Sequence, residues 1–466
     1  MRVVVVGNGM AGARFVSEVR ARDRRCAITV FGAEPRQPYN RVLLSNVLAG
    51  TATPEQVRLV DPAWYGEHDV EAYLGVGAVA VDRESRTVKA DDGSVTPYDV
   101  LVLATGSEAV VPPIPGAARG VAFRTLGDCE RILAAAASAR RAVVIGGGLL
   151  GVEAARGLAG RGLPVTLLHL AGHLMERQLD AEAGLVLGQT LAGLGVETKT
   201  GVTVTAISES GVATDSGFAP ADLVVLACGV RPVVGLAADA GLRIGRGIVV
   251  DDEMRTDDPA IFAIGECAQH EGRVYGLVAP CWEQAGVLAD IVTGADPHAR
   301  YRGSRLVTRL KAARVELAAM GETQLTEDDA EIVRFSHRHT GTYRKLVIRD
   351  GRLVGAILLG ETAAVGTLTQ LYDRGGPLPR DRTGLLFPGL AGAAPVADSP
   401  VRMPDAAKIC QCNNVTKGQI RAAWEAGART AADVTAATRA TTGCGTCRDA
   451  VEGIVGWLCE QEGVSA

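Results

Sequence analysis

The sequence is poor in aromatic residues, in long apolar runs and in blocks of like charge. Aromatic side chains make up 4% of the 466 residues, and the formal net charge is −5. Nucleic-acid-binding proteins need a basic face, and many add aromatic platforms for bases. The composition therefore excludes nucleic acid as a partner. No apolar run approaches the roughly 18 residues of a membrane-spanning helix, so no membrane partner is expected either.

The start of the chain lacks the pattern of an export signal. The apolar run at residues 3–6 leads directly into glycines, without a cleavage site. We therefore expect a cytoplasmic protein. Disulfides are rare in that compartment, so they are the least favoured use of the ten cysteines.

The first 300 residues alternate short β-branched runs with helical stretches rich in alanine, leucine and glycine. Such alternation is typical of a parallel sheet covered by helices. The sequence predicts an α/β fold with two dinucleotide-binding domains. The second domain is expected to be inserted in the first, because residues 261–266 return to a buried strand that ends in an acid.

The first glycine loop, at residues 7–12, lies between a predicted strand and a predicted helix. In the pattern Gly-x-Gly-x-x-Gly the glycines permit a tight turn, close approach of a pyrophosphate, and tight packing of helix on strand. Glu34 follows the next strand, where it is placed to accept hydrogen bonds from a ribose diol. A dinucleotide site is predicted, with a purely structural turn as the alternative. Its loop contacts are Gly7, Gly9, Met10, Ala11 and Gly12.

Two later segments identify FAD as this dinucleotide. One ends in Ala104, Thr105 and Gly106, and the other ends in Gly265 and Glu266. Both resemble flavin-contacting segments of pyridine-nucleotide-dependent flavoproteins. In that superfamily the acid at the second segment holds the ribityl–phosphate region, and most members carry aspartate where this chain has glutamate. The three segments in this order predict an FAD site.

A second glycine loop, at residues 146–151, follows a strand and opens a helix. The same backbone argument predicts a pyrophosphate site for a nicotinamide nucleotide. Glu153 is expected near the nicotinamide–flavin stack, or alternatively as a carboxylate favoured by the helix dipole. The predicted contacts are Gly146, Gly148, Leu149, Leu150, Gly151 and Glu153.

The strand after this loop places His169 where NADH enzymes often carry an acid. No clear clamp for a 2′-phosphate replaces that acid. Arg177 is the candidate for such a clamp, and a solvated surface arginine is the alternative. The pattern favours NADH and leaves NADPH open.

Dithiol chemistry requires a reactive cysteine close to the flavin. No cysteine lies between Cys26 and Cys129, and no Cys-x-x-Cys pair precedes Cys444. This absence excludes disulfide reductase, peroxidase and thioredoxin reductase functions.

Four cysteines near the end of the chain form two close pairs. Cys410 and Cys412 are separated by 31 residues from Cys444 and Cys447. Four thiolates suit an iron–sulfur cluster or a tetrahedral zinc ion, and plain thiols are a third alternative. The context of the second pair resembles the [2Fe–2S] domain of bacterioferritin-associated ferredoxin, which favours that cluster.

Helices are predicted next to both pairs. Thr416 and Gln419 have the spacing of a capping box, which starts a helix just after the first pair. A second helix is predicted at residues 449–460, with Cys459 as a buried helix residue. Helix N-termini near the cysteines would stabilise an anionic cluster.

These assignments predict five segments. They are a FAD-binding domain at residues 1–117 and 240–298, an NAD(P)H-binding domain at 118–239, an α/β C-terminal domain at 299–388, a linker at 389–407 and a [2Fe–2S] domain at 408–466.

The motifs together resemble the N-terminal half of the large subunit of assimilatory NAD(P)H nitrite reductase. The resemblance rests on the first glycine loop and on the paired cysteines. It also rests on residues 39–45, 174–180, 263–267, 276–280 and 415–418. It implies nested Rossmann-like domains of the glutathione-reductase type and a small helical domain like bacterioferritin-associated ferredoxin.

The same resemblance implies further cofactor contacts. Arg41 and Glu153 are the implied catalytic residues. Arg124 and Lys311 resemble FAD contacts of ferredoxin and rubredoxin reductases, with surface bases as the alternative. The implied flavin contacts are Arg41, Ser45, Val79, Arg124, Val278 and Lys311.

The sequence ends 19 residues after Cys447, without the family's sirohaem half. We therefore expect an electron-transfer enzyme in which NAD(P)H reduces FAD and the [2Fe–2S] cluster passes electrons to a separate nitrate or nitrite reductase. Two alternatives are a stand-alone NAD(P)H oxidase or ferredoxin/rubredoxin-type reductase, and a redox-responsive binding protein.

Overall fold

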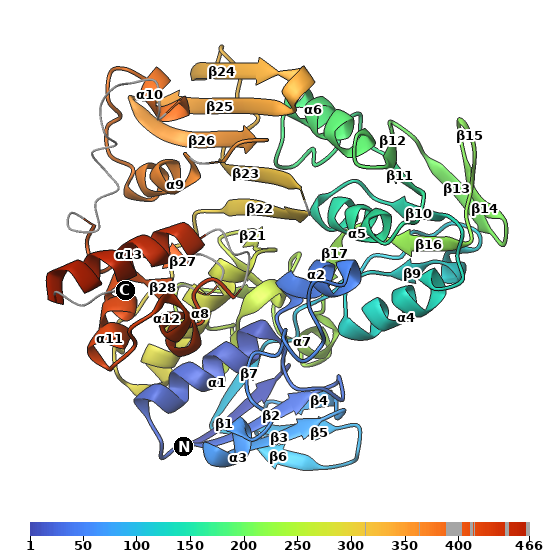
Figure 1. Ribbon diagram of the computed structural model, residues 1–466. Helices are drawn as coiled ribbons and strands as arrows, with labels where there is room; N and C mark the ends of the chain where they lie inside the picture. Colours follow the sequence, from blue (N-terminus) through green and yellow to red (C-terminus); the bar gives the residue numbers. More distant parts are fainter. Residues whose placement is uncertain are drawn as a thin grey trace. The chain divides into compact units, whose positions relative to one another are not determined.

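The computed structural model describes residues 1–312, 314–362, 364–387, 403–410, 413, 415–442 and 447–462. The chain divides into two compact units, and most of their helices and strands are labelled in Figure 1. Unit 1 comprises Met1–Val42, Thr53–Glu108 and Val230–Ser304, and unit 2 comprises Leu43–Ala52, Ala109–Gly229 and Arg305–Ala466.

Unit 1 is built on a parallel sheet with the strand order β19-β7-β1-β2-β3. Its central strand begins the chain with four consecutive buried valines, as a strand covered on both faces requires. The sheet strands are β1 (Arg2–Val6), β2 (Ala27–Gly32), β3 (Val70–Leu74), β7 (Val100–Leu103) and β19 (Ile261–Ala263). Because β19 pairs with β7, the predicted return of the chain to the first domain is confirmed.

Two helices of unit 1, α1 (Met10–Arg22) and α8 (Val278–Thr293), pack against each other beside this sheet. The remaining elements form small sheets and connections. They are η1 (Arg41–Leu43), α3 (Trp64–Glu67), β4 (Ala78–Asp82), β5 (Thr87–Ala90), β6 (Val95–Pro97), β8 (Ser107–Ala109), β17 (Val230–Pro232), α7 (Gly235–Asp239), β18 (Ile248–Val250), η3 (Gly265–Cys267), β20 (Ala268–His270) and β21 (Arg273–Val274).

Unit 2 begins with a second parallel sheet, in the order β12-β11-β10-β16-β9. Its strands are β9 (Val121–Ala122), β10 (Ala142–Ile145), β11 (Val165–His169), β12 (Val196–Thr200) and β16 (Leu223–Leu226). Its helices and smaller strands are α2 (Leu44–Ala49), η2 (Ala117–Arg119), α4 (Leu126–Ala136), α5 (Leu149–Gly160), α6 (Ala181–Ala192), β13 (Val204–Ser208), β14 (Gly211–Thr214) and β15 (Gly217–Pro220).

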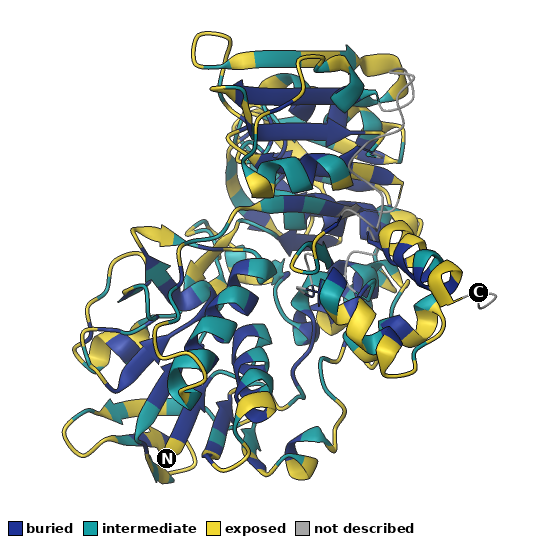
Figure 2. Ribbon diagram, turned by 90° about the vertical axis from the view of Figure 1, so that its left-hand side faces the viewer, coloured by how far each residue is buried: buried dark blue, intermediate teal, exposed yellow. Residues whose placement is uncertain are grey.

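An antiparallel sheet follows, in the order β22-β23-β26-β25-β24. Its central strands are almost wholly buried, as Figure 2 shows. Its elements are β22 (Val307–Ala312), β23 (Val315–Gly321), β24 (Glu331–His337), η4 (Arg338–Thr340), β25 (Thr342–Arg349), β26 (Arg352–Leu359), α9 (Val365–Arg374) and α10 (Thr383–Leu386). The change of pattern near residue 301 thus marks a change from parallel to antiparallel strands.

The last described elements form a small helical module. They are β27 (Lys408–Cys410), β28 (Val415–Thr416), α11 (Lys417–Glu425), α12 (Ala431–Thr438) and α13 (Arg448–Glu462). The predicted capping box at Thr416 and Gln419 is present, with each side chain bonded to the other residue's backbone N–H. Among all described residues, no helix has the length and apolar character needed to cross a membrane.

Asp180 connects helix α6 to the antiparallel sheet of unit 2. It caps α6 by accepting a hydrogen bond from the Ala183 N–H at 3.0 Å. Its other oxygen accepts from the Tyr343 hydroxyl at 2.6 Å and from Lys345 Nζ at 3.0 Å, both on β25. Burial alone would raise the pKa of Asp180, but these hydrogen bonds and the Lys345 charge outweigh burial and lower it.

We predict that Asp180→Asn strongly destabilises the protein. The side chain of Lys345 is 6% exposed, and its Nζ also donates to the carbonyl oxygens of Thr323 and Leu325. Removing the anion leaves this buried cation without a counter-charge, which costs about 3–5 kcal/mol. The midpoint of urea unfolding at neutral pH measures the effect. Asp328→Asn, the same change at an exposed position, is the matched control, and equal midpoints for the two variants would contradict the assignment.

The lowered pKa of Asp180 also predicts a pH dependence. A carboxyl group whose folded pKa lies below its unfolded value stabilises the fold above the unfolded value of about 3.9. This contribution is lost as the pH falls through the folded pKa. The difference in unfolding midpoint between parent and Asp180→Asn should therefore shrink as the pH falls from 7 toward 3.

Candidate cofactor and cluster sites

The first glycine loop is shaped by close backbone contacts. Gly7 has a φ of +111°, and a Cβ there would lie 2.1 Å from the carbonyl oxygen of Ala104. A Cβ on Gly12 would lie 2.0 Å from the carbonyl oxygen of Gly7. Gly9, the N-cap of α1, has nothing within 4 Å of its Cβ position. The loop therefore requires its outer glycines for its own folding and leaves open space beside the middle one.

The second glycine loop repeats this geometry. Gly146 has a φ of +111° and would place a Cβ 2.2 Å from the Ala227 carbonyl oxygen. Gly151 would place one 1.7 Å from the Gly146 carbonyl oxygen, whereas Gly148 again faces open space. Leu149 and Leu150 begin α5, and Glu153 on that helix is 5% exposed. Both loops thus have the shape that a pyrophosphate needs.

The three segments predicted to contact FAD meet around the first loop. Gly7 lies against Ala104, and a Cβ on Gly265 would lie 2.8 Å from the Ala11 side chain. Nearby, the Thr105 hydroxyl donates to the Val233 carbonyl oxygen at 2.7 Å. Val278 is the first residue of α8. The structure thus brings together segments that are far apart in the sequence.

Two residues that the sequence patterns did not single out hold the third segment. Gln284 in the middle of α8 accepts a hydrogen bond from the Gly265 N–H at 2.7 Å. The Ser107 hydroxyl, next to Gly106, donates to Glu266 at 2.6 Å. Neither contact follows a spacing rule, so no sequence signal identified it.

Glu34 lies directly after β2, as the ribose assignment requires. Its carboxylate accepts a hydrogen bond from the Tyr39 hydroxyl at 2.7 Å and forms an ion pair with Arg41. The side chains of Glu34 and Arg41 are 35% and 25% exposed. Two predicted FAD contacts therefore form one accessible acid–base cluster.

Among the buried side-chain polar atoms that have no hydrogen-bond partner within the described residues, two lie in segments predicted to contact FAD. One is the amide nitrogen of Asn8, in the first glycine loop, whose oxygen accepts from Tyr65. The other is the hydroxyl of Ser45, a side chain that is 3% exposed. A buried polar group without a partner is costly, so both positions fit a bound polar ligand.

The other predicted contacts are less distinctive. Val79 on β4 is 51% exposed. Arg124 lies just before α4, and its backbone N–H donates to the carboxylate of Asp128 on that helix. Lys311 lies in β22, and its side chain is outside the described part. The roles of the residues at both nucleotide sites stay predictions.

The cysteine module is described around two of its four predicted ligands. Cys410 and Cys447 are buried, with 0% and 5% exposure. The Thr441 N–H donates to the Cys447 sulfur at 3.3 Å, which suits a thiolate bound to a cluster. Cys412 and Cys444 lie outside the described residues, and without them no group of three or more metal-ligating side chains is found in the described part.

Asn413 connects the two cysteine segments. Its amide nitrogen donates to the Arg439 carbonyl oxygen at 2.7 Å and to the Thr442 hydroxyl at 3.1 Å. The segment after the first pair is therefore attached to the segment before the second pair. The helix α13 begins at Arg448, next to Cys447, so its positive N-terminal end favours a thiolate there.

Three cysteines outside the module are unsuited to dithiol chemistry. Burial raises the pKa of Cys129 to about 12 and also raises the pKa values of Cys228 and Cys267. A thiol with a raised pKa is a poor nucleophile. These pKa values agree with the exclusion of dithiol enzymes.

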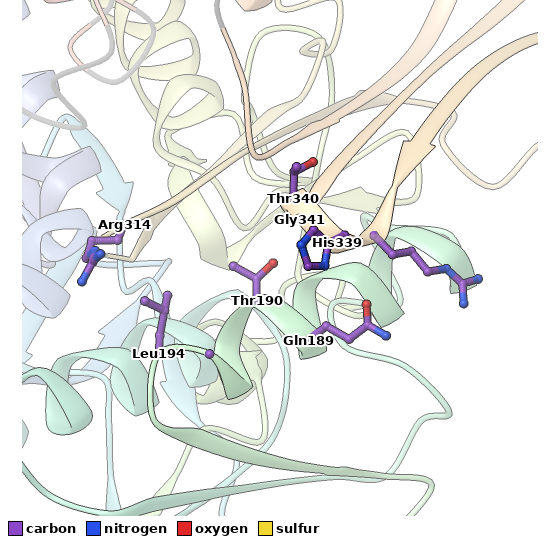
Figure 3. A pocket seen from close by; sticks show the side chains of 9 residues that line it. Gln189, Thr190, Leu194, Arg314, His339, Thr340 and Gly341 are labelled. Carbon is purple, nitrogen blue, oxygen red and sulfur yellow. The ribbon is translucent and has the colours of Figure 1, made fainter.

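Unit 2 also contains a cavity of about 670 Å³. It lies between α6, residue 314 and η4, as Figure 3 shows. Its lining includes Arg314, Arg338 and His339 but none of the predicted cofactor contacts. The cavity therefore shares no lining residue with the two glycine loops.

Two glycine loops of one geometry, each after a central strand of a parallel sheet, are typical of flavoproteins that bind a nicotinamide nucleotide. The family model described as pyridine nucleotide-disulphide oxidoreductase matches residues 1–285. The chain belongs to this family. Residues 307–375 match the rubredoxin NAD+ reductase C-terminal domain, and residues 408–457 match the BFD-like [2Fe-2S] binding domain.

Similar proteins support the same classification. The chain is 41% identical to a nitrite reductase [NAD(P)H] of Bacillus subtilis, over 97% of this chain and 57% of that protein. It is 37% identical to the assimilatory nitrate reductase electron transfer subunit of the same organism, over 99% of this chain and 60% of that protein. The chain thus spans little more than half the length of these relatives.

Solved structures agree with the fold. The putidaredoxin reductase–putidaredoxin complex matches with a TM-score of 0.75 and 26% identity, over 83% of this chain and 98% of that one. The predicted fold class, with nested dinucleotide-binding domains and a C-terminal iron–sulfur domain, is confirmed. The predicted cofactors FAD, NAD(P)H and a [2Fe–2S] cluster are confirmed at the level of the family.

We predict that Gly9→Ala folds but binds FAD at least about tenfold more weakly. The φ of −86° at Gly9 and the open space beside it tolerate a methyl group. That group would occupy the space that a pyrophosphate needs, and tenfold corresponds to only about 1.4 kcal/mol. The flavin content of purified protein and FAD titration of stripped protein measure the effect.

Two variants control this experiment. Gly235→Ala adds a methyl group in open space at the start of α7, and it should retain full flavin content. Gly12→Ala should instead disturb folding, because its Cβ meets backbone. Parental FAD affinity in Gly9→Ala would show that the first loop is a structural turn.

Proposed function

We propose that this protein takes hydride from NAD(P)H and delivers single electrons to a terminal reductase for nitrate or nitrite. The observation that carries the proposal is the presence in one chain of two pyrophosphate-shaped loops and of two buried cysteines, Cys410 and Cys447, in the C-terminal module. Bound FAD supplies the conversion between two-electron and one-electron chemistry that nicotinamide and an iron–sulfur cluster require.

Hydride transfer depends on stacking and orientation more than on acid–base groups. The open sides of Gly9 and Gly148 leave room for the two pyrophosphates to approach backbone N–H groups. Glu34 is proposed to orient the FAD ribose. Arg41, held by Glu34, and Glu153, nearly enclosed on α5, are proposed to act at the reacting rings.

The cysteine module is proposed to be the exit for electrons. Cys410, Cys412, Cys444 and Cys447 are the proposed ligands. Burial of Cys410 and Cys447 keeps water from the sulfur atoms, and the Thr441 N–H compensates negative charge on one of them. Such hydrogen bonds tune the potential of a cluster.

The identity of the acceptor is supported by the relatives. One is named a nitrite reductase and another an electron transfer subunit of nitrate reductase. We propose that the acceptor here is carried by a separate polypeptide, as the second name indicates for that relative. A ferredoxin- or rubredoxin-type reductase is the second candidate, favoured by the match of residues 307–375.

We predict that Cys447→Ser abolishes the [2Fe–2S] signal but leaves flavin reduction intact. The ligand is lost, whereas both glycine loops are unchanged. Electron paramagnetic resonance of the reduced protein measures the cluster, and stopped-flow bleaching of the flavin by NADH measures hydride transfer. Cys459→Ala is the matched control, since this buried thiol on α13 is not a proposed ligand. Stoichiometric zinc without iron in protein prepared anaerobically would contradict the cluster assignment.

For the acceptor, we predict NADH-dependent reduction of nitrate or nitrite when the protein is mixed with the corresponding terminal reductase. Each protein alone should give only background rates. Cys447→Ser should bring the mixture to background while turnover with ferricyanide persists. Rapid ferricyanide turnover without oxyanion reduction by either reductase would exclude this acceptor. Rapid reduction of a ferredoxin or rubredoxin in the same assay would favour the second candidate.

A further inference from the structure

The end of β11 carries a histidine where a carboxylate often binds the adenosine ribose of NADH. His169 is the last residue of that strand and is 8% exposed. A Cβ on Gly147, in the second glycine loop, would lie 2.7 Å from the ring. The imidazole therefore fills the space between the glycine loop and the strand end, and a carboxylate must come from elsewhere.

The hydrogen bonds of His169 define its tautomer. Its Nδ1 accepts from the Gly147 N–H at 3.0 Å, so this nitrogen carries no proton. The proton is then on Nε2, which lies 2.9 Å from Oε2 of Glu176. His169 thus connects the glycine loop to the carboxylate of Glu176. No second hydrogen bond to that carboxylate is found within the described residues, which leaves its Oε1 available to a ligand.

The backbone around Glu176 is fixed from two sides. The Met175 N–H donates to the Gly147 carbonyl oxygen at 2.9 Å, and Met175 has a φ of +52°. Gln324 donates to the carbonyl oxygens of Glu176 at 3.1 Å and Leu179 at 2.8 Å. A non-glycine residue with positive φ persists where its surroundings demand it. Glu176 is therefore a positioned carboxylate with a side chain that is 37% exposed.

We infer that Glu176 is the ribose-binding carboxylate of the nicotinamide nucleotide site and that the site selects NADH. This inference rests on the proposed binding of NAD(P)H at the second loop. Glu176 accepts hydrogen bonds from the ribose hydroxyls, and His169 is a positioning residue that holds the carboxylate at the strand end. A 2′-phosphate at this place meets a like charge, which disfavours NADPH.

The neighbouring Arg177 is exposed and is the competing determinant. An arginine clamp on a 2′-phosphate selects NADPH. Glu176 is anchored to the glycine loop through His169, whereas Arg177 is exposed. Hydrogen bonds thus hold the carboxylate of Glu176 beside the second glycine loop, so Glu176 is the stronger candidate for the determinant of nucleotide choice.

The first experiment compares kcat/KM for NADH and NADPH with ferricyanide as acceptor. The parent protein should prefer NADH. In Glu176→Gln the ratio should fall by about 10- to 100-fold, the range expected for lost hydrogen bonds to a charged group. Glu182→Gln on α6 removes the same charge from a residue outside the site and should keep the parental ratio. An unchanged ratio in Glu176→Gln, or a parental preference for NADPH that Arg177→Ala removes, overturns the inference.

The second experiment separates positioning from structure. His169→Phe keeps a buried ring but loses both hydrogen bonds, so KM for NADH should rise while kcat at saturation changes little. Adding His169→Asp to Glu176→Gln places a carboxylate directly at the strand end and should restore the preference for NADH. A fall in kcat for both nucleotides without a change in their ratio would assign His169 a purely structural role.

Calorimetric binding of ADP-ribose and 2′-phospho-ADP-ribose separates this inference from the proposed function. These fragments report on the ribose site without any electron transfer. The parent should bind ADP-ribose more tightly, and Glu176→Gln should reduce that difference. If neither fragment binds, the second loop is not a nucleotide site and the proposed function fails. If both bind with a difference that Glu176→Gln does not change, only the role of Glu176 fails.

Discussion

In each of the two glycine loops, two close backbone contacts that only glycine permits organise the surrounding strands and helix. In each loop the first glycine lies against a carbonyl oxygen at the end of a neighbouring strand, and the last lies against the first. Strand, loop and helix are thereby locked together within about one atomic diameter, as close packing requires. The space beside the middle glycine is a by-product of this locking. Cofactor geometry and fold stability therefore depend on the same few contacts.

Local signals made much of the fold predictable from the sequence. The valine run of β1, the two glycine loops, the return at β19 and the capping box at Thr416 each depend on residues close in sequence or on a repeated pattern. The paired cysteines were equally easy to recognise from their spacing in the sequence. The exclusion of dithiol chemistry rested on the positions where cysteines are absent and stays a prediction, and burial raises the pKa of Cys129.

The remaining contacts depend on side chains that only the fold brings together. Gln284 reaches Gly265 from the middle of a helix, and Tyr343 reaches Asp180 from another sheet. Glu176 reaches His169 across a loop with an uncommon backbone conformation. No periodicity encodes such pairs, because either partner alone is an ordinary polar residue. The sequence therefore indicated a missing acid at His169, and the structure shows another acid beside it.

The segment from Glu176 to Asp180 has consequences for recombining such proteins. At one end it is linked to the glycine loop through His169. At the other end it is bound by Gln324, which follows β23, and by Tyr343 and Lys345 on β25. A chimaera that exchanges only the antiparallel sheet would remove partners from this segment and loosen a loop many residues away. A working exchange must transplant the segment and its three partners as one set. The same constraint applies when evolution exchanges domains of this kind between proteins.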